Sequence, residues 1–388
     1  MTTITKRAIQ VIASYWLCIL LLFLLFLLTL FGTLEQAEHG IYFVQQKYFN
    51  SFYLIHELPG GIPLPLPGAY LVMGTLTLNL LFGAIFRSPL HWKRFGILIA
   101  HGGIFVLAFS GFVTFHYSVS GHMKLYEGES ARYFESYYDW SITVTEVGDN
   151  SQGRQFTIPG ADFEDMEPGE SRRFWAEEFP FELELSNYQK NSEPRKIENT
   201  RPDSVDGIIL ESIPLAAEEE MNFRGITATL VNNATQEPPK ALLWGASRIP
   251  WTVPVGEQNY AIHLRHKRYS VPFTITLDKF IRDMHPGTSM AANFESRVTL
   301  AEKGTERNVE IKMNHPLRNA GYTLFQASWG PQNAGPNTPL FSSFAVVRNP
   351  ADQWPKFACY IIGLGMIVHF TQHLLKYLRA ETRRRSHV

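Results

Sequence analysis

Apolar residues in this chain gather into four long runs, and polar residues dominate between the third run and the fourth. The four runs cover residues 8–32, 69–86, 95–115 and 356–378. A membrane-crossing helix needs about 20 mainly apolar residues, so each run predicts a transmembrane helix. The first run is much longer than the apolar part of a signal peptide, which predicts an anchor that is not cleaved. The fourth run is the weakest, because it contains His369 and His373.

Basic residues near the ends of the runs predict the orientation, because Lys and Arg favour the cytoplasmic side of a membrane. They lie at Lys6, Arg7, Arg87, Lys93 and Arg94, and in the 379–388 tail at Arg379, Arg383, Arg384 and Arg385. The 33–68 segment offers only Lys47. We therefore expect both termini, including the 379–388 tail, in the cytoplasm. The 33–68 loop and the 117–355 region are expected on the outer side.

The 117–355 region predicts a large all-β domain. Its short runs alternate polar and apolar residues or are rich in β-branched residues, as in SITVTEV, GITATLV and FSSFAVVRN, and turn residues separate them. This spacing favours a sandwich-like fold or an open barrel over a helical domain. A weak internal echo relates Pro180–Tyr188 to Pro272–Phe280, both with the pattern Pro-Phe-x-apolar-x-Leu-x-x-aromatic. Two similar halves explain the echo as well as two unrelated strands that each follow a proline.

Composition and motifs argue against several functions. The 388 residues carry a formal net charge of −1, which argues against a nucleic-acid partner. Both cysteines, Cys18 and Cys359, fall in predicted transmembrane helices, so the sequence offers no Cys-x-x-Cys-His motif for covalent haem attachment and no thiol relay. The sequence also lacks His-Glu-x-x-His, Gly-x-Ser-x-Gly and phosphate-binding glycine motifs, so no hydrolase site is predicted.

One ionisable residue, His101, interrupts the apolar run FGILIAHGGIFVLAFSGFVTF. A charged or strongly polar side chain at such a depth costs about 2.5–3.5 kcal/mol to insert, which makes it a candidate functional residue. A neutral imidazole is well suited to bind a metal ion or haem iron. Small residues around it form a strip against which a helix or a flat macrocycle can pack closely; they are Gly96, Ala100, Gly103, Ser110 and Gly111. The simpler alternative is a core histidine bonded to a neighbouring carbonyl.

The pattern resembles the ResB/CcsB family of System II cytochrome c maturation. The shared features are three apolar runs, a large β region, a fourth run near the C-terminus and a histidine in the third run. The resemblance is strongest in LFGTLEQ, after the first run, and between YSVPFTITLDKF and YTLFQASW. There, Met313–Arg318 and Gly321–Gln326 resemble the family's sequence motif N-x-P-L-x-x-x-G-Y-x-x-Y-Q-S. The similarity is weakest across residues 150–260.

This resemblance implies a multi-pass protein of the bacterial inner (cytoplasmic) membrane with its large domain on the periplasmic side. It implies an accessory subunit of a cytochrome c haem-lyase complex, which moves haem b across the membrane and presents it to apocytochrome c. Haem b would be bound non-covalently and transiently, with His101 as an axial ligand. A ResC/CcsA-type membrane partner would complete the chemistry, and a thiol-reducing thioredoxin-like protein would act indirectly.

The second axial ligand has two candidate sources. The resemblance places it in the partner protein. Within this chain, His369 lies seven residues from Lys376, just as His101 lies seven residues from Arg94, so both are expected at similar depth. His369 also shares a helix face with Gly365 and His373. A His101–His369 pair therefore stays open as an alternative, whereas His373 is expected to reach toward the headgroups.

The remaining histidines and functions are weaker candidates. Histidines expected just outside the membrane, which could guide haem propionates or iron, are His39, His56, His116 and His122. Histidines expected to be structural or exposed in the β domain are His263, His266, His285 and His315. Two other functions use the same features: a b-type haem subunit of a quinone-linked electron-transfer complex, and a membrane-anchored β scaffold without haem.

Overall fold

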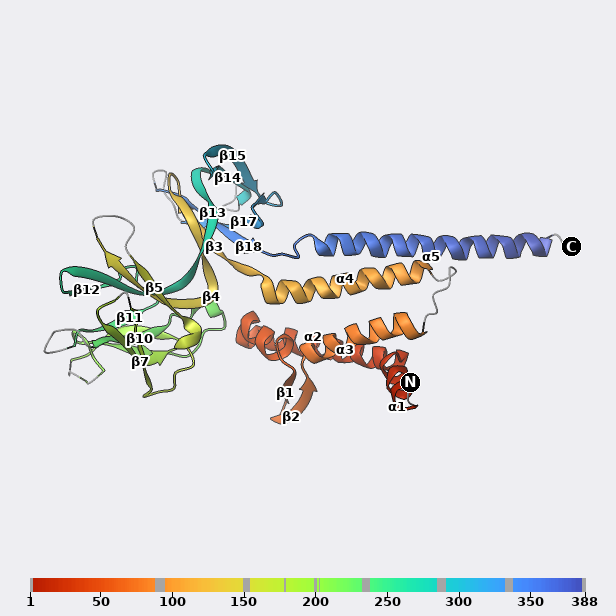
Figure 1. Cartoon of the computed structure of the whole chain (residues 1–388), viewed down its shortest axis with the longest axis horizontal. Coiled ribbons are helices and arrows are strands. Elements are labelled where there is room, and N and C mark those ends of the chain that lie inside the picture. The colour runs from red at the N-terminus through yellow and green to blue at the C-terminus, as the bar shows by residue number, and fades with distance from the viewer. Residues whose placement is uncertain are drawn as a thin grey trace. The chain divides into compact units, whose positions relative to one another are not determined.

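The computed structural model describes residues 3–87, 95–148, 154–177, 179–198, 201, 203–231, 238–284, 291–331 and 338–385. The chain divides into two compact units (Figure 1). The helical unit comprises Met1–Ser118 and Asn349–Val388, and the β unit comprises Val119–Arg348. The expected fold class, four long apolar helices together with a large antiparallel β domain, is confirmed.

Among the described residues, the helical unit contains α1 (Thr3–Ile12), α2 (Tyr15–Val44), α3 (Ala69–Phe82), α4 (Phe95–Tyr117) and α5 (Trp354–Arg385), with π-helical turns at Gln45–Phe49 and Gly83–Arg87 that extend α2 and α3. All of these helices except α1 are long and apolar enough to cross a membrane. The first apolar run is divided between α1 and α2. Ser14 explains this division, because its hydroxyl accepts hydrogen bonds from the backbone N–H groups of Trp16 and Leu17 and so caps α2.

The 33–68 segment, expected as a loop, contains ordered structure. Helix α2 continues to Val44 and bends at Gly40, whose φ of 78° is one that glycine adopts without strain. A hairpin of β1 (Tyr53–Leu58) and β2 (Ile62–Pro67) follows. Buried apolar residues join α2, the hairpin and α3 into one core, and they include Leu21, Leu28, Val44, Tyr48, Leu54, Leu66 and Val72. The segment is ordered because it contributes apolar side chains to this core.

The strands of the β unit are antiparallel wherever they pair. In chain order they are β3 (Val119–Tyr126), β4 (Ser130–Val147), β5 (Gln155–Pro159), β6 (Ser171–Phe174), β7 (Glu182–Gln189), β8 (Ser192–Lys196), β9 (Ile208–Ser212), β10 (Gly225–Val231), β11 (Lys240–Trp244), β12 (Trp251–Val255), β13 (Gln258–Met284), β14 (Ala291–Glu302), β15 (Thr305–Lys312), β16 (Leu317–Asn319), β17 (Tyr322–Gly330) and β18 (Phe341–Arg348). Among the described residues, the largest sheet has the order β15-β14-β13-β4-β3-β18-β17-β16, with β12 on β13 and β5 on β4. A smaller sheet has the order β11-β10-β7-β6, and β8 pairs with β9.

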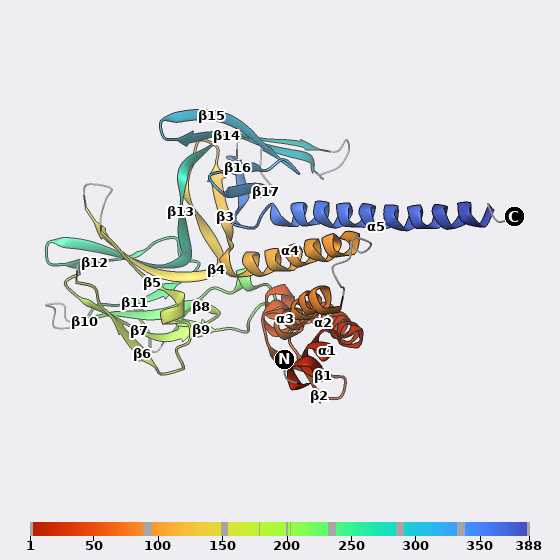
Figure 2. The same ribbon diagram turned by 45° about the vertical axis from the view of Figure 1, so that its right-hand side comes forward.

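The described residues of the β unit form two hydrophobic cores. The Trp140 core includes Trp140, Ile142, Phe181, Leu183, Leu185, Ile226 and Leu264. The Phe273 core includes Phe134, Phe273, Ile275, Leu277, Val298 and Phe344. The long strands β4 and β13 contribute to both cores and pair with each other over much of their length (Figure 2). The two similar segments found in the sequence therefore lie in different cores, with Pro180–Tyr188 in the Trp140 core and Pro272–Phe280 in the Phe273 core. Their strand neighbours also differ, because β7 lies between β10 and β6, whereas this part of β13 pairs with β14.

Candidate functional site

Helices α4 and α5 pack with their backbones almost in contact, and they run side by side in both ribbon views (Figure 1 and Figure 2). A Cβ on Gly103 would lie 2.9 Å from the Ile362 backbone nitrogen and 3.0 Å from the Ala358 carbonyl oxygen. A Cβ on Gly96 would lie 2.7 Å from the Gly365 carbonyl oxygen. Glycine is therefore required at these positions, because any side chain would separate the helices.

The predicted small-residue strip is thus covered by a helix and not left open for a macrocycle. Gly96, Ala100 and Gly103 face α5, and Ser110 is 1% exposed. Gly111 does not belong to the strip, because a Cβ there would meet nothing within 4 Å. The strip fixes how α4 is rotated against α5, and this rotation decides where the neighbouring histidine points.

His101 leaves α4 on a different side from α5. It follows Gly96 by five residues, which corresponds to a rotation of about 140° around a helix with 3.6 residues per turn. Its side chain is half-buried. Gly102, the next residue, has open space where its Cβ would be. The face of α4 that carries His101 is therefore distinct from the face that packs on α5.

A hydrogen bond selects the tautomer of a neutral His101 ring. Its Nδ1 lies 2.8 Å from the carbonyl oxygen of Ile97, one helical turn earlier. A carbonyl oxygen only accepts hydrogen bonds, so Nδ1 must carry the proton. The lone pair is then on Nε2. Histidines that ligate metals commonly donate their other N–H in this way. The same bond also satisfies the simpler alternative of a core histidine, so it is compatible with both predictions.

His369 lies on the face of α5 that packs against α4. A Cβ on Gly96 would meet the backbone of His369, and the Nδ1 atom of His369 is buried without a hydrogen-bond partner among the described residues. The His373 ring lies 4.5 Å from the His369 ring, centre to centre, and is exposed. The structure therefore brings α4 and α5 together. His369 of α5 contacts the side of α4 that carries Gly96, whereas His101 leaves α4 from a different side.

His116 lies farther along α4 than His101, near its C-terminal end. Tyr70, at the start of α3, donates or accepts a hydrogen bond at the His116 Nε2, and its ring packs on Phe115. His116 follows His101 by 15 residues, or about 22 Å along the helix axis. The two histidines are therefore too far apart to share one iron, and His116 ties α3 to α4.

Sequence reasoning missed a polar network between α2, the π-helical turn and the β1–β2 hairpin. Lys47 donates to Glu35 at 2.6 Å, and the Tyr48 hydroxyl contacts both Glu35 and the His56 Nδ1. The His56 ring stacks on Phe31 with ring centres 4.3 Å apart. The signal was present, because Glu35 belongs to the LFGTLEQ motif and directly follows an apolar run. His39, in contrast, is exposed and stacks only on Phe43 among the described rings.

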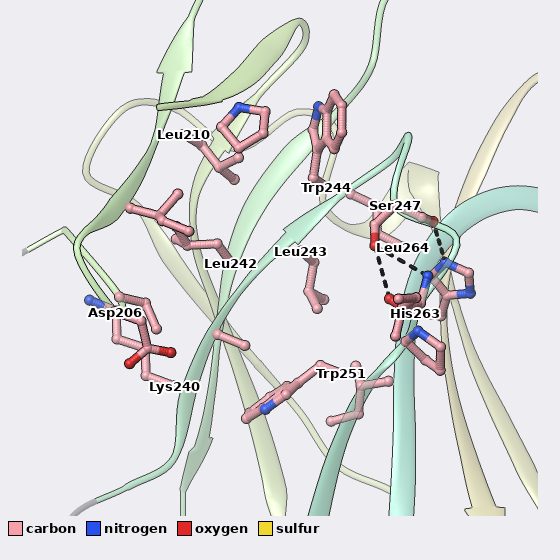
Figure 3. Close-up of a pocket in the computed structure, with 17 residues that line it drawn as sticks. Asp206, Leu210, Lys240, Leu242, Leu243, Trp244, Ser247, Trp251, His263 and Leu264 are labelled. Atoms are coloured by element: carbon pink, nitrogen blue, oxygen red, sulfur yellow. Dashed lines mark hydrogen bonds between the residues drawn. The ribbon is translucent and has the colours of Figure 1, made fainter. Parts of the chain in front are cut away.

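The β unit also contains a cavity of about 360 Å³ (Figure 3). It lies between β11, β12, β13 and the β8–β9 pair, and Trp244 and Trp251 line it. His263, also in its wall, uses Nε2 to contact the carbonyl oxygen of Ser247 at 2.9 Å. His263 is therefore a satisfied structural residue, as expected.

The other β-domain histidines differ in their surroundings. His315 is exposed, as expected, whereas His285 lies outside the described residues. His122 and His266 are half-buried and lie close together. Within the described part of the chain, no group of three or more His, Cys, Asp or Glu side chains is arranged to hold a metal ion.

Comparisons with known proteins agree with the sequence resemblance. Residues 247–340 match the model of the ResB-like family. Over 56 residues the chain is 41% identical to "Cytochrome c biogenesis protein CcsB" of Synechococcus sp. (strain CC9605) and of Synechococcus sp. (strain CC9902). Each alignment covers 14% of this chain and 13% of the relative's length. The predicted resemblance is confirmed for residues 247–340, which are similar to the ResB-like family.

Proposed function

We propose that this protein is a haem-handling membrane subunit of System II cytochrome c biogenesis. The family match at 247–340 and the name of the two cyanobacterial relatives support this role. The observation that carries it is the His101 ring. It lies within a candidate membrane span, and its Nδ1–H donates to Ile97, which leaves the Nε2 lone pair for a ligand.

The residues around His101 fit a transiently bound haem b. The Ile97 carbonyl sets the tautomer of the imidazole, and α5 holds α4 from another side. Apolar side chains near the same face are well exposed, with Ile104 43% and Phe112 50% exposed. This face can therefore contact a flat apolar ligand or a partner helix. When bound, haem b supplies the groups that become linked to apocytochrome c.

In this proposal a partner of the ResC/CcsA type would supply the second ligand of the haem iron. His101 leaves α4 about 140° around the helix from Gly96, whereas His369 lies against Gly96. A pair formed by these two histidines would require α4 to rotate and to lose its contact with α5. His369 therefore has a packing role here, and the exposed face near His101 is where the partner contributes its ligand.

The proposal also includes the expected location and orientation. The protein spans the bacterial cytoplasmic membrane with both termini inside, and its β unit lies on the periplasmic side, where apocytochrome c and its thiol-reducing system are found. Reporter fusions at residues 200 and 388 test this arrangement. An external signal at 388 contradicts it.

The decisive experiment replaces His101. We expect His101→Gly to remove haem from the complex with the partner and to abolish cytochrome c maturation while the protein stays inserted, because Nε2 is the proposed ligand. Added imidazole should partly restore both, since it fills the cavity and returns an axial nitrogen. The exposed His373→Ala serves as the matched control and should mature cytochrome c normally. Normal maturation by His101→Ala would show that the assignment is wrong.

His369→Ala then distinguishes the two sources of the second ligand. If the partner supplies it, the complex of this variant keeps its haem, and the isolated wild-type chain holds haem weakly. A strong low-spin haem spectrum in the isolated chain that disappears in His369→Ala would contradict the proposal. A full and stable haem content without a partner would favour the alternative of an electron-transfer subunit.

A further inference from the structure

Two histidines of the β unit lie close together on neighbouring parts of the largest sheet. His122 is on β3 and His266 is on β13, and both strands pair with β4. Their ring centres are 6.4 Å apart, and the rings are nearly perpendicular, at 79°. Neither histidine belongs to the site around His101, which lies in the helical unit.

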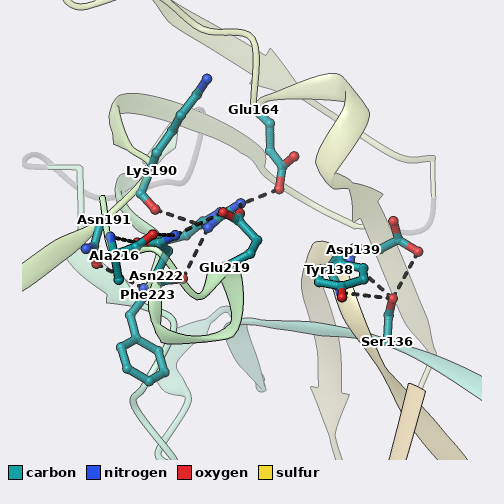
Figure 4. A network of polar contacts seen from close by, with 11 residues as sticks. Ser136, Tyr138, Asp139, Glu164, Lys190, Asn191, Ala216, Glu219, Asn222 and Phe223 are labelled. Carbon is teal, nitrogen blue, oxygen red and sulfur yellow. Dashed lines mark hydrogen bonds and ion pairs between the residues drawn. The ribbon is translucent and has the colours of Figure 1, made fainter. Parts of the chain in front are cut away.

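An interruption in the pairing of strand β4 lies beside these histidines. Trp140 pairs with His266, and Glu135 pairs with Arg268, so residues 136–139 of β4 face a single residue of β13. Ser136 and Asp139 hold this bulge together. The Ser136 hydroxyl accepts the backbone N–H of Asp139 at 3.1 Å and donates to its carboxylate at 3.1 Å (Figure 4). The ladder is thus opened locally and stabilised in that form.

Aromatic rings support both imidazoles. The His266 ring lies against Trp140 with ring centres 3.9 Å apart, and the His122 ring lies 5.6 Å from that of Tyr137. A neutral imidazole keeps a lone pair on one ring nitrogen, and this is the form that binds metal ions.

One polar atom of this pair is buried without a hydrogen-bond partner among the described residues, and it is the His266 Nδ1. The Arg224 guanidinium, which is paired with Glu219 and Glu164, lies 5.7 Å from the centre of the Trp140 ring that supports His266. Native proteins leave few buried polar atoms unsatisfied, and such an atom indicates a place for water, an ion or a ligand.

We propose that His122 and His266 together bind a transition-metal ion through their imidazole nitrogens. Two imidazole nitrogens, each about 2 Å from one metal ion, place the ring centres ~6 Å apart, close to the observed separation. The Glu135 carboxylate lies 3.9 Å from the His122 Nε2, but it is paired with Arg268. Because the described residues contain no group of three metal-binding side chains, the ion must bring its other ligands with it. Water supplies them for a bare ion, and the macrocycle supplies them for haem iron. The alternative in which the bound metal is haem iron rests on the proposed function, whereas the alternative of a bare metal ion does not.

The test uses the purified full-length chain in detergent with two separate probes. In one arm Zn²⁺ is titrated and bound metal is measured after dialysis. In the other arm hemin is titrated into the His101→Gly variant, and its low-spin absorption is recorded. We expect one equivalent of one probe to bind, and His122→Ala and His266→Ala each to weaken that binding at least tenfold. His263→Ala and His315→Ala are the controls and should bind as before.

The two arms identify the source of the metal. Binding of Zn²⁺ alone indicates a bare ion, and a low-spin hemin spectrum indicates haem iron. His266→Gln keeps a polar side chain and removes the ligand nitrogen, so it serves if His266→Ala does not fold. Absence of binding by both probes, or binding unchanged in the His122 and His266 variants, overturns the inference. Because His101 is absent from the hemin arm, this result is independent of whether His101→Gly matures cytochrome c.

Discussion

The contact between α4 and α5 makes a sharp prediction for two adjacent glycines. Gly103 faces α5, and its Cβ would fall 2.9 Å from the Ile362 backbone nitrogen. Gly102 is one residue earlier on the same helix, and its Cβ would meet nothing within 4 Å. Gly103→Ala and Gly102→Ala therefore add the same methyl group to the same helix, once against a neighbouring backbone and once into open space.

The two substitutions should change the free energy of unfolding in opposite directions. Alanine favours a helix over glycine by about 1 kcal/mol, so Gly102→Ala should stabilise the protein by up to about that amount. Gly103→Ala gains the same helix propensity but forces atoms into a filled contact, which costs about 1–3 kcal/mol. The displaced atoms include the backbone of Ile362 and Ala358, which cannot rotate away, so the upper part of that range applies. We expect a net destabilisation of about 1–2 kcal/mol.

Unfolding by sodium dodecyl sulfate in mixed micelles, followed by tryptophan fluorescence, measures this difference for the purified protein. The two variants should differ by about 2–3 kcal/mol, with the wild type between them. The comparison cancels any effect of the detergent that is common to both variants. If Gly103→Ala is as stable as Gly102→Ala, the close packing of α4 on α5 is incorrect, and the direction assigned to His101 loses its basis.

Two further predictions concern other parts of the chain. Tyr48→Phe removes the hydroxyl that contacts Glu35 and His56, and it should destabilise the protein by about 1–3 kcal/mol in the same assay. The control is Tyr53→Phe, which should have no effect because Tyr53 is 61% exposed. In the β unit, hydrogen bonds from Lys312 lower the pKa of Glu295 from its usual 4.5, and Arg297 acts in the same direction. The stabilisation by this carboxylate is fully present above pH 4.5 and is lost as the pH falls through the lower pKa of the folded state. Glu295→Gln should therefore make the free energy of unfolding decline less steeply over this pH range. An unchanged dependence of stability on acid pH would contradict the assignment.

The sequence was sufficient to predict the elements that depend on local pattern. Four apolar runs predicted four helices, and short alternating runs predicted a β domain, because burial of one strand face or one whole helix leaves a direct mark on the sequence. The ordered structure in 33–68 was missed for the same reason. Its prolines and glycines are typical of a loop, and only its packing against Leu28 and Val72 explains why it forms a helix and a hairpin.

The arrangement of the candidate sites depends on contacts that no local pattern specifies. The sequence singled out His101 and His369 and predicted a similar depth for both, but the side from which each leaves its helix depends on Gly96 and Gly103 meeting α5. His122 and His266 are 144 residues apart in sequence, and they come together only because β3 and β13 both pair with β4. Reasoning from sequence therefore assigned them separate roles, with His122 as a possible guide of haem propionates or iron and His266 as a structural or exposed residue.

The pairing of β4 with β13 has a consequence for how this protein is made. Glu135 bonds to Arg268, which is 133 residues later in the chain, and both hydrophobic cores include residues of β4 and β13. While the chain is being synthesised, Phe134, Trp140 and Ile142 therefore remain exposed to water until β13 has emerged. Such long-range strand pairing folds slowly and leaves an intermediate that is prone to aggregation. A chain truncated between residues 200 and 250 should consequently bind molecular chaperones and fail to accumulate, even though it already contains β3 to β7.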